Sequence, residues 1–146
     1  MATIIGIAGS LRAGSLNAKL LRAAVELAPP SLTVEVESIR DIPLYDGDVE
    51  EQQGIPPAVA RLKDRIAAAE GVLLVTPEYN NSIPGPFKNA IDWLSRPASD
   101  IPRVFHDRPA ALMGATPGGA GTTLAQAAWL PVLLIWRKSR KFYKKQ

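Results

Sequence analysis

Short apolar runs alternate along this chain with longer segments of helical periodicity, and this alternation restricts the possible folds more than any other feature. The runs cover residues 3–8, 33–39, 71–76 and 110–114. The first and third are almost continuously apolar, as expected of strands that are covered on both faces. The second alternates apolar and polar residues, which indicates a strand nearer an edge of the sheet.

Four further segments carry apolar residues at helical spacing, namely residues 17–28, 56–69, 86–95 and 122–134. Strands that alternate with helices of this length predict an α/β fold, in which helices cover both faces of a parallel sheet. Because the crossovers are right-handed, every strand-to-helix loop lies at the same edge of the sheet. Ligands of open α/β sheets bind at that edge, so the loops after the first, third and fourth strands form the candidate site.

The 146 residues contain no cysteine and one histidine, His106. Without cysteine, the chain has no disulfide scaffold, thiolate zinc site, iron–sulfur cluster or cysteine nucleophile. The single histidine argues against a His-rich metal site and a Ser-His-Asp triad, and we expect His106 to be a surface loop residue. The first residues lack the basic segment of a secretory signal, which predicts a cytoplasmic protein.

The net charge of +3 comes from the last ten residues. Residues 137–146 hold six basic side chains and no acidic one, whereas residues 1–136 hold eleven basic and 14 acidic ones, a net charge of −3. We therefore expect one domain over residues 1–136 and a basic tail over 137–146. Such a tail can bind nucleic acid or an anionic membrane surface, but a solvated end is the commoner case. Residues 1–136 show no basic stripe, so no nucleic-acid partner is expected.

The loop over residues 9–17 follows the first strand and opens the first helix. Hydroxyl groups of Ser10 and Ser15, the guanidinium of Arg12 and the helix N-terminus are all suited to a phosphate monoester. The loop matches neither the dinucleotide GxGxxG pattern nor a Walker A motif. The alternative is a plain turn in which Ser15 or Asn17 caps the helix.

The loop over residues 77–86 is rich in Pro, Asn and Gly, which favours a fixed, non-repetitive backbone. Its backbone groups and Asn80 are suited to hydrogen bonds with the edge of a heteroaromatic ring, and Tyr79 to packing beside that ring. Tyr79 can equally be a half-buried loop aromatic. For Lys88 and Asp92, just beyond the loop, we prefer a solvated ion pair at helical spacing.

The loop over residues 115–123 has three glycines in four positions, 118–121. Glycine lets the main chain lie flat against a planar ligand, although such a loop can also be a flexible connection. Together the three loops suit a mononucleotide, because one edge of the sheet then carries a loop for a phosphate, a loop for a polar ring and a flat backbone. They suit a flavin better than a nucleoside triphosphate.

With these loops, the sequence resembles the NADPH-dependent FMN reductase family of flavodoxin-like proteins, which includes quinone, azo-dye and chromate reductases. The resemblance rests on residues 9–17 (GSLRAGSLN), 77–93 (PEYNNSIPGPFKNAIDW), 116–119 and 124–126, and it runs from about Thr3 to about Leu133. It implies a three-layer sandwich with parallel strand order 2-1-3-4-5.

The resemblance also implies the function and the residues that carry it. A hydride would pass from NADPH or NADH to bound FMN, and from there electrons would pass to a quinone, free flavin, azo dye or similar acceptor, without a catalytic protein side chain. The FMN phosphate region would be held by Ser10, Arg12, Ser15, Leu16 and Asn17. The ribityl chain and ring would be lined by Pro77, Glu78, Tyr79, Asn80 and Ser82, and the ring would be covered by Thr116, Gly118 and Gly119.

Family members are commonly dimers or tetramers, so the resemblance implies a homo-oligomer in which residues 43–46 can face a neighbouring subunit's site. The family usually continues with a further strand and helix, where this chain has an apolar segment, residues 127–136, and then the basic tail. We therefore expect the fifth strand to be missing or replaced and the fourth to be an exposed edge. The less favoured alternative is that residues 133–136 form a short fifth strand.

Two further expectations concern the same segment. Pro131 should kink or end the last helix, because proline lacks the backbone N–H that a helix needs. The ten apolar residues are too few to cross a membrane. Besides the reductase, two alternatives stay open: an FMN-binding electron-transfer module, and an inactive member of the family.

Overall fold

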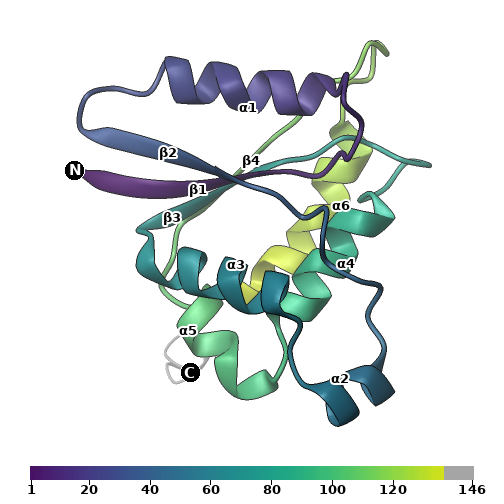
Figure 1. Cartoon of the computed structure of the whole chain (residues 1–146). Coiled ribbons are helices and arrows are strands. Elements are labelled where there is room, and N and C mark those ends of the chain that lie inside the picture. Colours follow the sequence, from purple (N-terminus) through teal and green to yellow (C-terminus); the bar gives the residue numbers. More distant parts are fainter. Residues whose placement is uncertain (137–146) are drawn as a thin grey trace, which may run out of the picture.

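A four-stranded parallel sheet forms the centre of the protein (Figure 1). The computed structural model describes residues 1–136 of the chain. The strand order is β2-β1-β3-β4, as predicted. The strands are β1 (Ala2–Ala8), β2 (Leu32–Glu37), β3 (Gly71–Val75) and β4 (Ala110–Met113).

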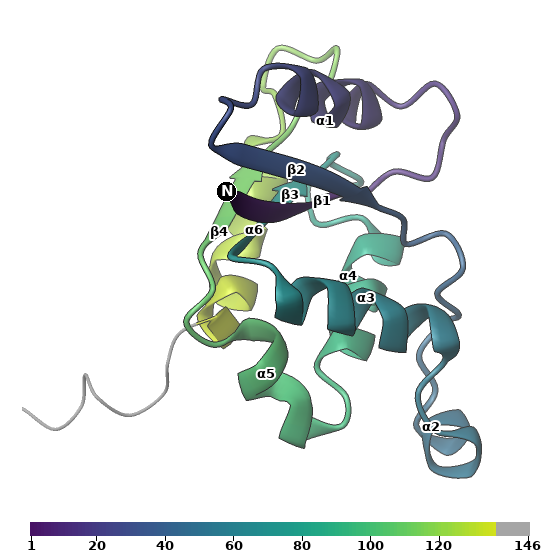
Figure 2. The same cartoon turned by 60° about the vertical axis from the view of Figure 1, so that its left-hand side comes forward.

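Helices cover both faces of the sheet and complete three layers (Figure 2). One face carries α1 (Leu16–Glu26), and the other carries α3 (Pro57–Ala68), α4 (Gly85–Leu94) and α6 (Thr123–Leu133). The predicted flavodoxin-like α/β sandwich is confirmed. Alternate residues of the central strands, such as Ile5, Ile7, Val72 and Leu74, are buried in the larger core, which lies on the face with three helices.

Three short helices were not predicted. They are α2 (Gly47–Gln53), α5 (Ile101–Phe105) and the 3-10 turn η1 (Ala98–Asp100). Helices of three to seven residues carry too few apolar repeats to be recognised by periodicity, and isolated segments of this length are unstable in water. Tertiary contacts hold α5, which buries Val104 and Phe105. The other two bury no residue: α2 is capped by Asp46, and η1 is held through the ion pair of Asp100 with Lys63.

The alternative of a short fifth strand over residues 133–136 is wrong. Residues Leu134–Trp136 form a 3-10 turn, η2, that continues α6. The Trp136 ring packs edge-to-face on Phe105 with the ring centroids 4.6 Å apart, and this burial favours the turn over an extended edge strand. The α-helix includes Pro131 and runs two residues beyond it before it tightens to η2.

No helix within residues 1–136 is long and apolar enough to cross a membrane. In the same part of the chain, no group of acidic and histidine side chains is arranged to hold a metal ion. The predicted basic tail, residues 137–146, lies outside the described residues.

Lys63 is a charged side chain inside the core. It points from α3 toward the segment after α4, and its side chain is 2% exposed. Its ammonium group lies 2.6 Å from a carboxylate oxygen of Asp100 and donates a hydrogen bond to the carbonyl oxygen of Arg96. The hydrogen bond from Lys63 lowers the pKa of Asp100 below its ordinary value of 3.8, although partial burial opposes the shift. The ion pair therefore joins two elements that the sequence separates.

We predict that Asp100→Asn lowers the free energy of unfolding at pH 7 by about 2–3 kcal/mol, because it leaves a buried ammonium without its counter-charge. The Asp100 pKa is lowered in the folded state, so the ion pair stabilises the fold at pH values above 3.8. That contribution is lost as pH falls through the lowered pKa. Urea unfolding measures the free energy of unfolding at pH 7 and near pH 3. The difference between the wild type and the variant should be smaller near pH 3 than at pH 7. Asp41→Asn, at an exposed carboxylate, should have no such effect.

Candidate cofactor site

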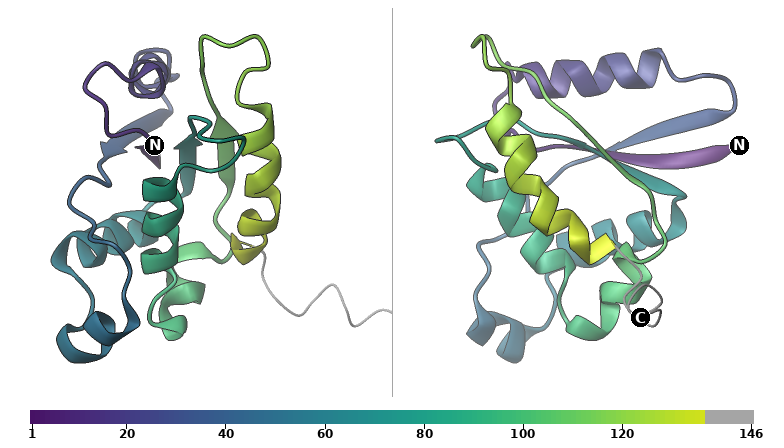
Figure 3. Two further views of the ribbon diagram at one scale, coloured as in Figure 1. Left: turned by 90° about the vertical axis from the view of Figure 1, so that its right-hand side faces the viewer. Right: turned by 180° about the vertical axis from the view of Figure 1, so that it is seen from behind.

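Three loops meet at the carboxyl edge of the sheet (Figure 3). They connect β1 to α1, β3 to α4, and β4 to α6, and we call them the first, second and third loops. Backbone hydrogen bonds continue the sheet into the first residues of these loops. The Gly9 N–H donates to the Val75 carbonyl, and the Thr76 N–H donates to the Met113 carbonyl. The parallel topology therefore brings together the segments in which the site residues were predicted.

The first loop carries a positively charged side chain without a partner, close in sequence to the start of α1. Arg12 is exposed, and its guanidinium has no hydrogen bond or ion pair with any residue in 1–136. Ser15 is the N-cap of α1, and its hydroxyl accepts from the Ala18 N–H at 3.1 Å, so the capping alternative is correct. Within the same described residues, the backbone N–H groups of Leu16 and Asn17 have no acceptor. Free N–H groups and an unpaired guanidinium are the donors that a phosphate requires.

Asn17 joins the first loop to the third. Its side-chain nitrogen donates to the Ala115 carbonyl, and its side-chain oxygen accepts from the Ala115 N–H, both at 2.9 Å. The residue is 3% exposed. Because both amide atoms are used within the protein, a contact from Asn17 to a phosphate would come from its backbone.

The second loop is a tight hairpin. Tyr79 and Ser82 exchange backbone hydrogen bonds of 3.2 and 3.1 Å, and Asn80 and Asn81 between them have φ angles of 49° and 61°. Asparagine tolerates this left-handed region, and two such residues form the turn that suits a two-residue hairpin. The Tyr79 side chain is directed to the first loop, with its hydroxyl 3.4 Å from that of Ser10. Tyr79 itself is 41% exposed, so one side of the ring is open to a ligand.

Glu78 joins the second loop to α6. Its carboxylate accepts from the Ala125 N–H at 2.9 Å, in the first turn of that helix. A carboxylate is favourable there because the first N–H groups of a helix lack partners and carry partial positive charge. Its neighbour Pro77 is buried and accepts a hydrogen bond from the Thr76 hydroxyl. Glu78 and Pro77, two predicted site residues, therefore hold the second loop in place through contacts within the protein.

Two glycines allow these segments to approach closely. A Cβ at Gly9 would overlap the ring of Phe87, and one at Gly114 would overlap the Thr122 side chain and the Thr76 carbonyl oxygen. Above them, the third loop is open: a Cβ at Gly119 would meet no atom within 4 Å, and one at Gly118 only the Thr116 hydroxyl at 3.9 Å. The backbone at Gly118 and Gly119 therefore has open space beside it, as a contact with a ligand would require.

One residue at this edge was missed by the sequence analysis. Arg40, which follows β2, donates to the Leu11 carbonyl at 2.6 Å and fixes the middle of the first loop. A single exposed arginine has no local pattern. Only the pairing of β2 with β1 places it beside this loop.

Two other interpretations concern residues away from the loops. Lys88 and Asp92 form the expected exposed ion pair at 2.7 Å on α4. His106 is partly exposed at the end of α5, on the segment that enters β4, and therefore lies toward the opposite edge of the sheet from the three loops.

An α/β sandwich whose first loop offers an exposed guanidinium and free N–H groups, with two further loops at the same edge, has the architecture of nucleotide-binding flavodoxin-like folds. The model of the NADPH-dependent FMN reductase family matches residues 2–140. The chain belongs to the NADPH-dependent FMN reductase family. The match continues seven residues beyond Leu133, where we placed the end of the resemblance.

Individual relatives agree with this assignment. The chain is 48% identical over 123 residues to an NAD(P)H-dependent FMN reductase of Pseudomonas aeruginosa, covering 84% of this chain and 64% of that protein. It is 51% identical over 94 residues to a quinone reductase of Escherichia coli, covering 64% of this chain and 50% of that protein. The chain thus spans between half and about two thirds of the length of these relatives.

A solved structure shows the same arrangement of elements. The flavoenzyme NAD(P)H:(acceptor) oxidoreductase FerB from Paracoccus denitrificans superposes with a TM-score of 0.85 at 41% sequence identity. The superposition covers 94% of this chain and 74% of that one.

We predict that Asn17→Ala lowers the free energy of unfolding by about 1–3 kcal/mol, because the partly buried N–H and carbonyl of Ala115 lose their partners. The loss should be measured by urea unfolding at neutral pH. Lys19→Ala, at an exposed position of the same helix, should change it by less than about 0.5 kcal/mol. Equal stability of the two variants would contradict the bridging role of Asn17.

Proposed function

We propose that the protein binds FMN at the carboxyl edge of the sheet and uses it to pass a hydride equivalent from NADPH or NADH to an electron acceptor. The acceptor class is a quinone, free flavin, azo dye or similar small molecule. The observation that carries this proposal is the unpaired Arg12 guanidinium beside the free N–H groups of α1, in a loop that belongs to the family match. When bound, FMN supplies the hydride-accepting and electron-donating chemistry, and the protein supplies binding and orientation.

The first loop would hold the phosphate. Arg12 offers a fixed charge with two parallel donors, and the N–H groups of Leu16 and Asn17 add the favourable end of the helix dipole. The Ser10 hydroxyl accepts a long 3.4 Å hydrogen bond from the Arg12 N–H and lies 3.4 Å from the Tyr79 hydroxyl. With Tyr79 as the donor of that pair, Ser10 would donate its own proton to the phosphate. The Ser15 hydroxyl would act indirectly, by fixing the start of α1.

The second and third loops would orient the ring system. The hairpin of residues 79–82 exposes backbone groups and the Tyr79 ring, while the open backbone at Gly118 and Gly119 leaves room for a planar ligand. Thr116 restrains the third loop through its hydroxyl, which accepts from the Gly118 N–H at 3.4 Å. Backbone donors near the ring favour the added negative charge of a reduced flavin. No protein acid or nucleophile is required.

We also infer that the protein is cytoplasmic and, as the family resemblance implies, a homo-oligomer. A reaction that consumes NAD(P)H fits the compartment where these nucleotides are kept reduced. The 43–46 segment, proposed to face a neighbouring subunit, is fixed to α4: Asn89 donates to the Pro43 carbonyl at 2.8 Å and accepts from the Tyr45 N–H at 2.8 Å. Leu44, held between these contacts, is 84% exposed.

We expect Arg12→Ala to weaken FMN binding by about 10- to 100-fold, because a charge-assisted phosphate contact contributes roughly 1.5–3 kcal/mol. Titration followed by flavin fluorescence measures the affinity. Riboflavin, which lacks the phosphate, should bind the wild type and the variant equally. Arg22→Ala on the exposed side of α1 is the matched control and should bind FMN as the wild type does. Unchanged FMN affinity in Arg12→Ala would contradict the phosphate assignment.

Anaerobic mixing with NADPH, and separately with NADH, tests the reductase activity. The FMN-loaded protein should lose its visible flavin absorbance rapidly, and addition of a quinone should restore it. Retained FMN that neither nucleotide bleaches would contradict the enzyme and favour an electron-transfer module. Failure to bind FMN at all would identify an inactive member of the family.

A further inference from the structure

Most arginines of the protein are already engaged, and two of the others lie in or against the first loop. Residues 1–136 contain eight arginines, and four of them form ion pairs with acidic side chains: Arg61, Arg65, Arg96 and Arg103. A fifth, Arg108, donates to backbone carbonyls of α3 and α5. In the same part of the chain, Arg12, Arg22 and Arg40 have no acidic partner. Arg12 lies in the first loop, and Arg40 contacts it.

The Arg40 guanidinium is held in place but only partly used. One terminal nitrogen donates to the Leu11 carbonyl at 2.6 Å, and the residue is exposed. Its backbone is also restrained, because its N–H donates to the Ser38 hydroxyl at 3.1 Å and the preceding Ile39 is buried in the core. A guanidinium has five N–H donors, and those that remain have no acceptor within residues 1–136. Arg40 therefore presents a positioned cation with free donors at the carboxyl edge of the sheet.

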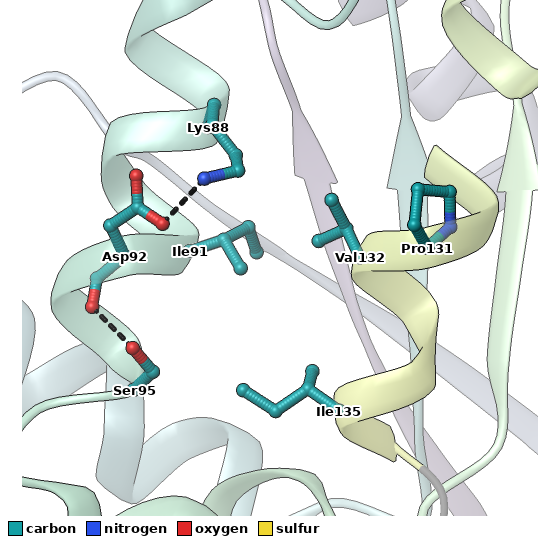
Figure 4. A pocket seen from close by; sticks show the side chains of 7 residues that line it. All are labelled: Lys88, Ile91, Asp92, Ser95, Pro131, Val132 and Ile135. Carbon is teal, nitrogen blue, oxygen red and sulfur yellow. Dashed lines mark hydrogen bonds and ion pairs between the residues drawn. The ribbon is translucent and has the colours of Figure 1, made fainter. Parts of the chain in front are cut away.

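The unpaired positive charge of this edge lies on its β2 side. On the β4 side, the third loop with α6 and η2, residues 114–136, carries no charged residue. In the second loop, the Glu78 carboxylate is bound to a helix N–H, and just beyond that loop Lys88 is paired with Asp92 (Figure 4). Among the described residues, a ligand with several phosphate groups therefore meets unpaired cations at this edge only toward β2.

We propose that Arg40 is a specificity-determining residue that binds the 2′-phosphate of NADPH and so favours NADPH over NADH. This rests on the proposed function, in which the FMN phosphate engages Arg12 and the second and third loops orient the ring. The nicotinamide must reach that ring for hydride transfer, so the adenosine half of the co-substrate lies farther along the edge. Toward β2, that half meets Arg40. NADH lacks the 2′-phosphate, and a planar guanidinium binds such a group through parallel N–H donors.

Asp41, the next residue, is the alternative determinant at this place. In α/β folds that bind dinucleotides, a carboxylate binds the free 2′-hydroxyl of NADH, whereas an arginine accommodates the 2′-phosphate of NADPH. Both side chains are exposed, and they form no ion pair with each other. Arg40 is favoured because its guanidinium is fixed against the first loop, while the Asp41 side chain has no hydrogen bond or ion pair with any residue from 1 to 136.

Fragments of the co-substrate test this assignment without hydride transfer. Adenosine 2′,5′-bisphosphate carries the 2′-phosphate, and 5′-AMP lacks it. With FMN at saturation, we expect isothermal titration calorimetry to show that the wild type binds the bisphosphate about tenfold more tightly, the lower end for a charge-assisted phosphate contact. Arg40→Gln should abolish this difference. The matched control is Arg22→Gln, at the unpaired arginine on the exposed side of α1, which should keep it.

Steady-state kinetics separate nucleotide recognition from support of the first loop. Arg40→Gln should raise the KM for NADPH about tenfold and leave the KM for NADH and the kcat with NADH unchanged. Arg40→Lys, which keeps the charge but loses the parallel donors, should give an intermediate KM for NADPH. FMN affinity, titrated separately, should not change. A residue that only supports the loop would instead weaken FMN, NADPH and NADH together.

Three results would overturn the assignment. They are equal affinity of the wild type for the bisphosphate and 5′-AMP, a preference that Arg40→Gln leaves unchanged, and an equal loss for FMN and both nucleotides in that variant. A preference for NADH that Asp41→Asn abolishes would also overturn it. Failure of the proposed function looks different: flavin that neither nucleotide bleaches, in a protein that still prefers the bisphosphate through Arg40, would contradict the reductase and support the role of Arg40.

Discussion

The paired hydrogen bonds between Asn17 and Ala115 fix the geometry on which the site depends. They join residues 98 positions apart and are partly buried, and a hydrogen bond away from water is electrostatically stronger and costs more when it is lost. Through them, the start of α1, which follows the loop that carries Arg12, is fixed to the loop that carries Gly118. A ligand that spans the phosphate and ring regions requires this constancy, because the loops would otherwise have to be ordered at the moment of binding.

The polar residues of the three loops divide into those that hold the loops and those that stay free. Asn17, Glu78 and Ser15 all satisfy backbone groups of the protein, whereas Arg12 has no partner in the described residues. The family resemblance implies that all four are ligand contacts, because they lie in its motifs, and the sequence alone left capping by Ser15 or Asn17 open. The structure separates them, and it leaves an unpaired cation where the resemblance places a phosphate.

Much of the fold could be predicted, because short apolar runs mark the four strands and helical periodicity marks the four main helices. What could not be predicted depends on contacts between distant segments. Arg40 reaches the first loop only because β2 pairs with β1, and Leu134–Trp136 turns instead of extending because Trp136 packs on Phe105. Taken alone, residues 133–136 are apolar, branched and aromatic, and such residues suit a strand as well as a helical turn.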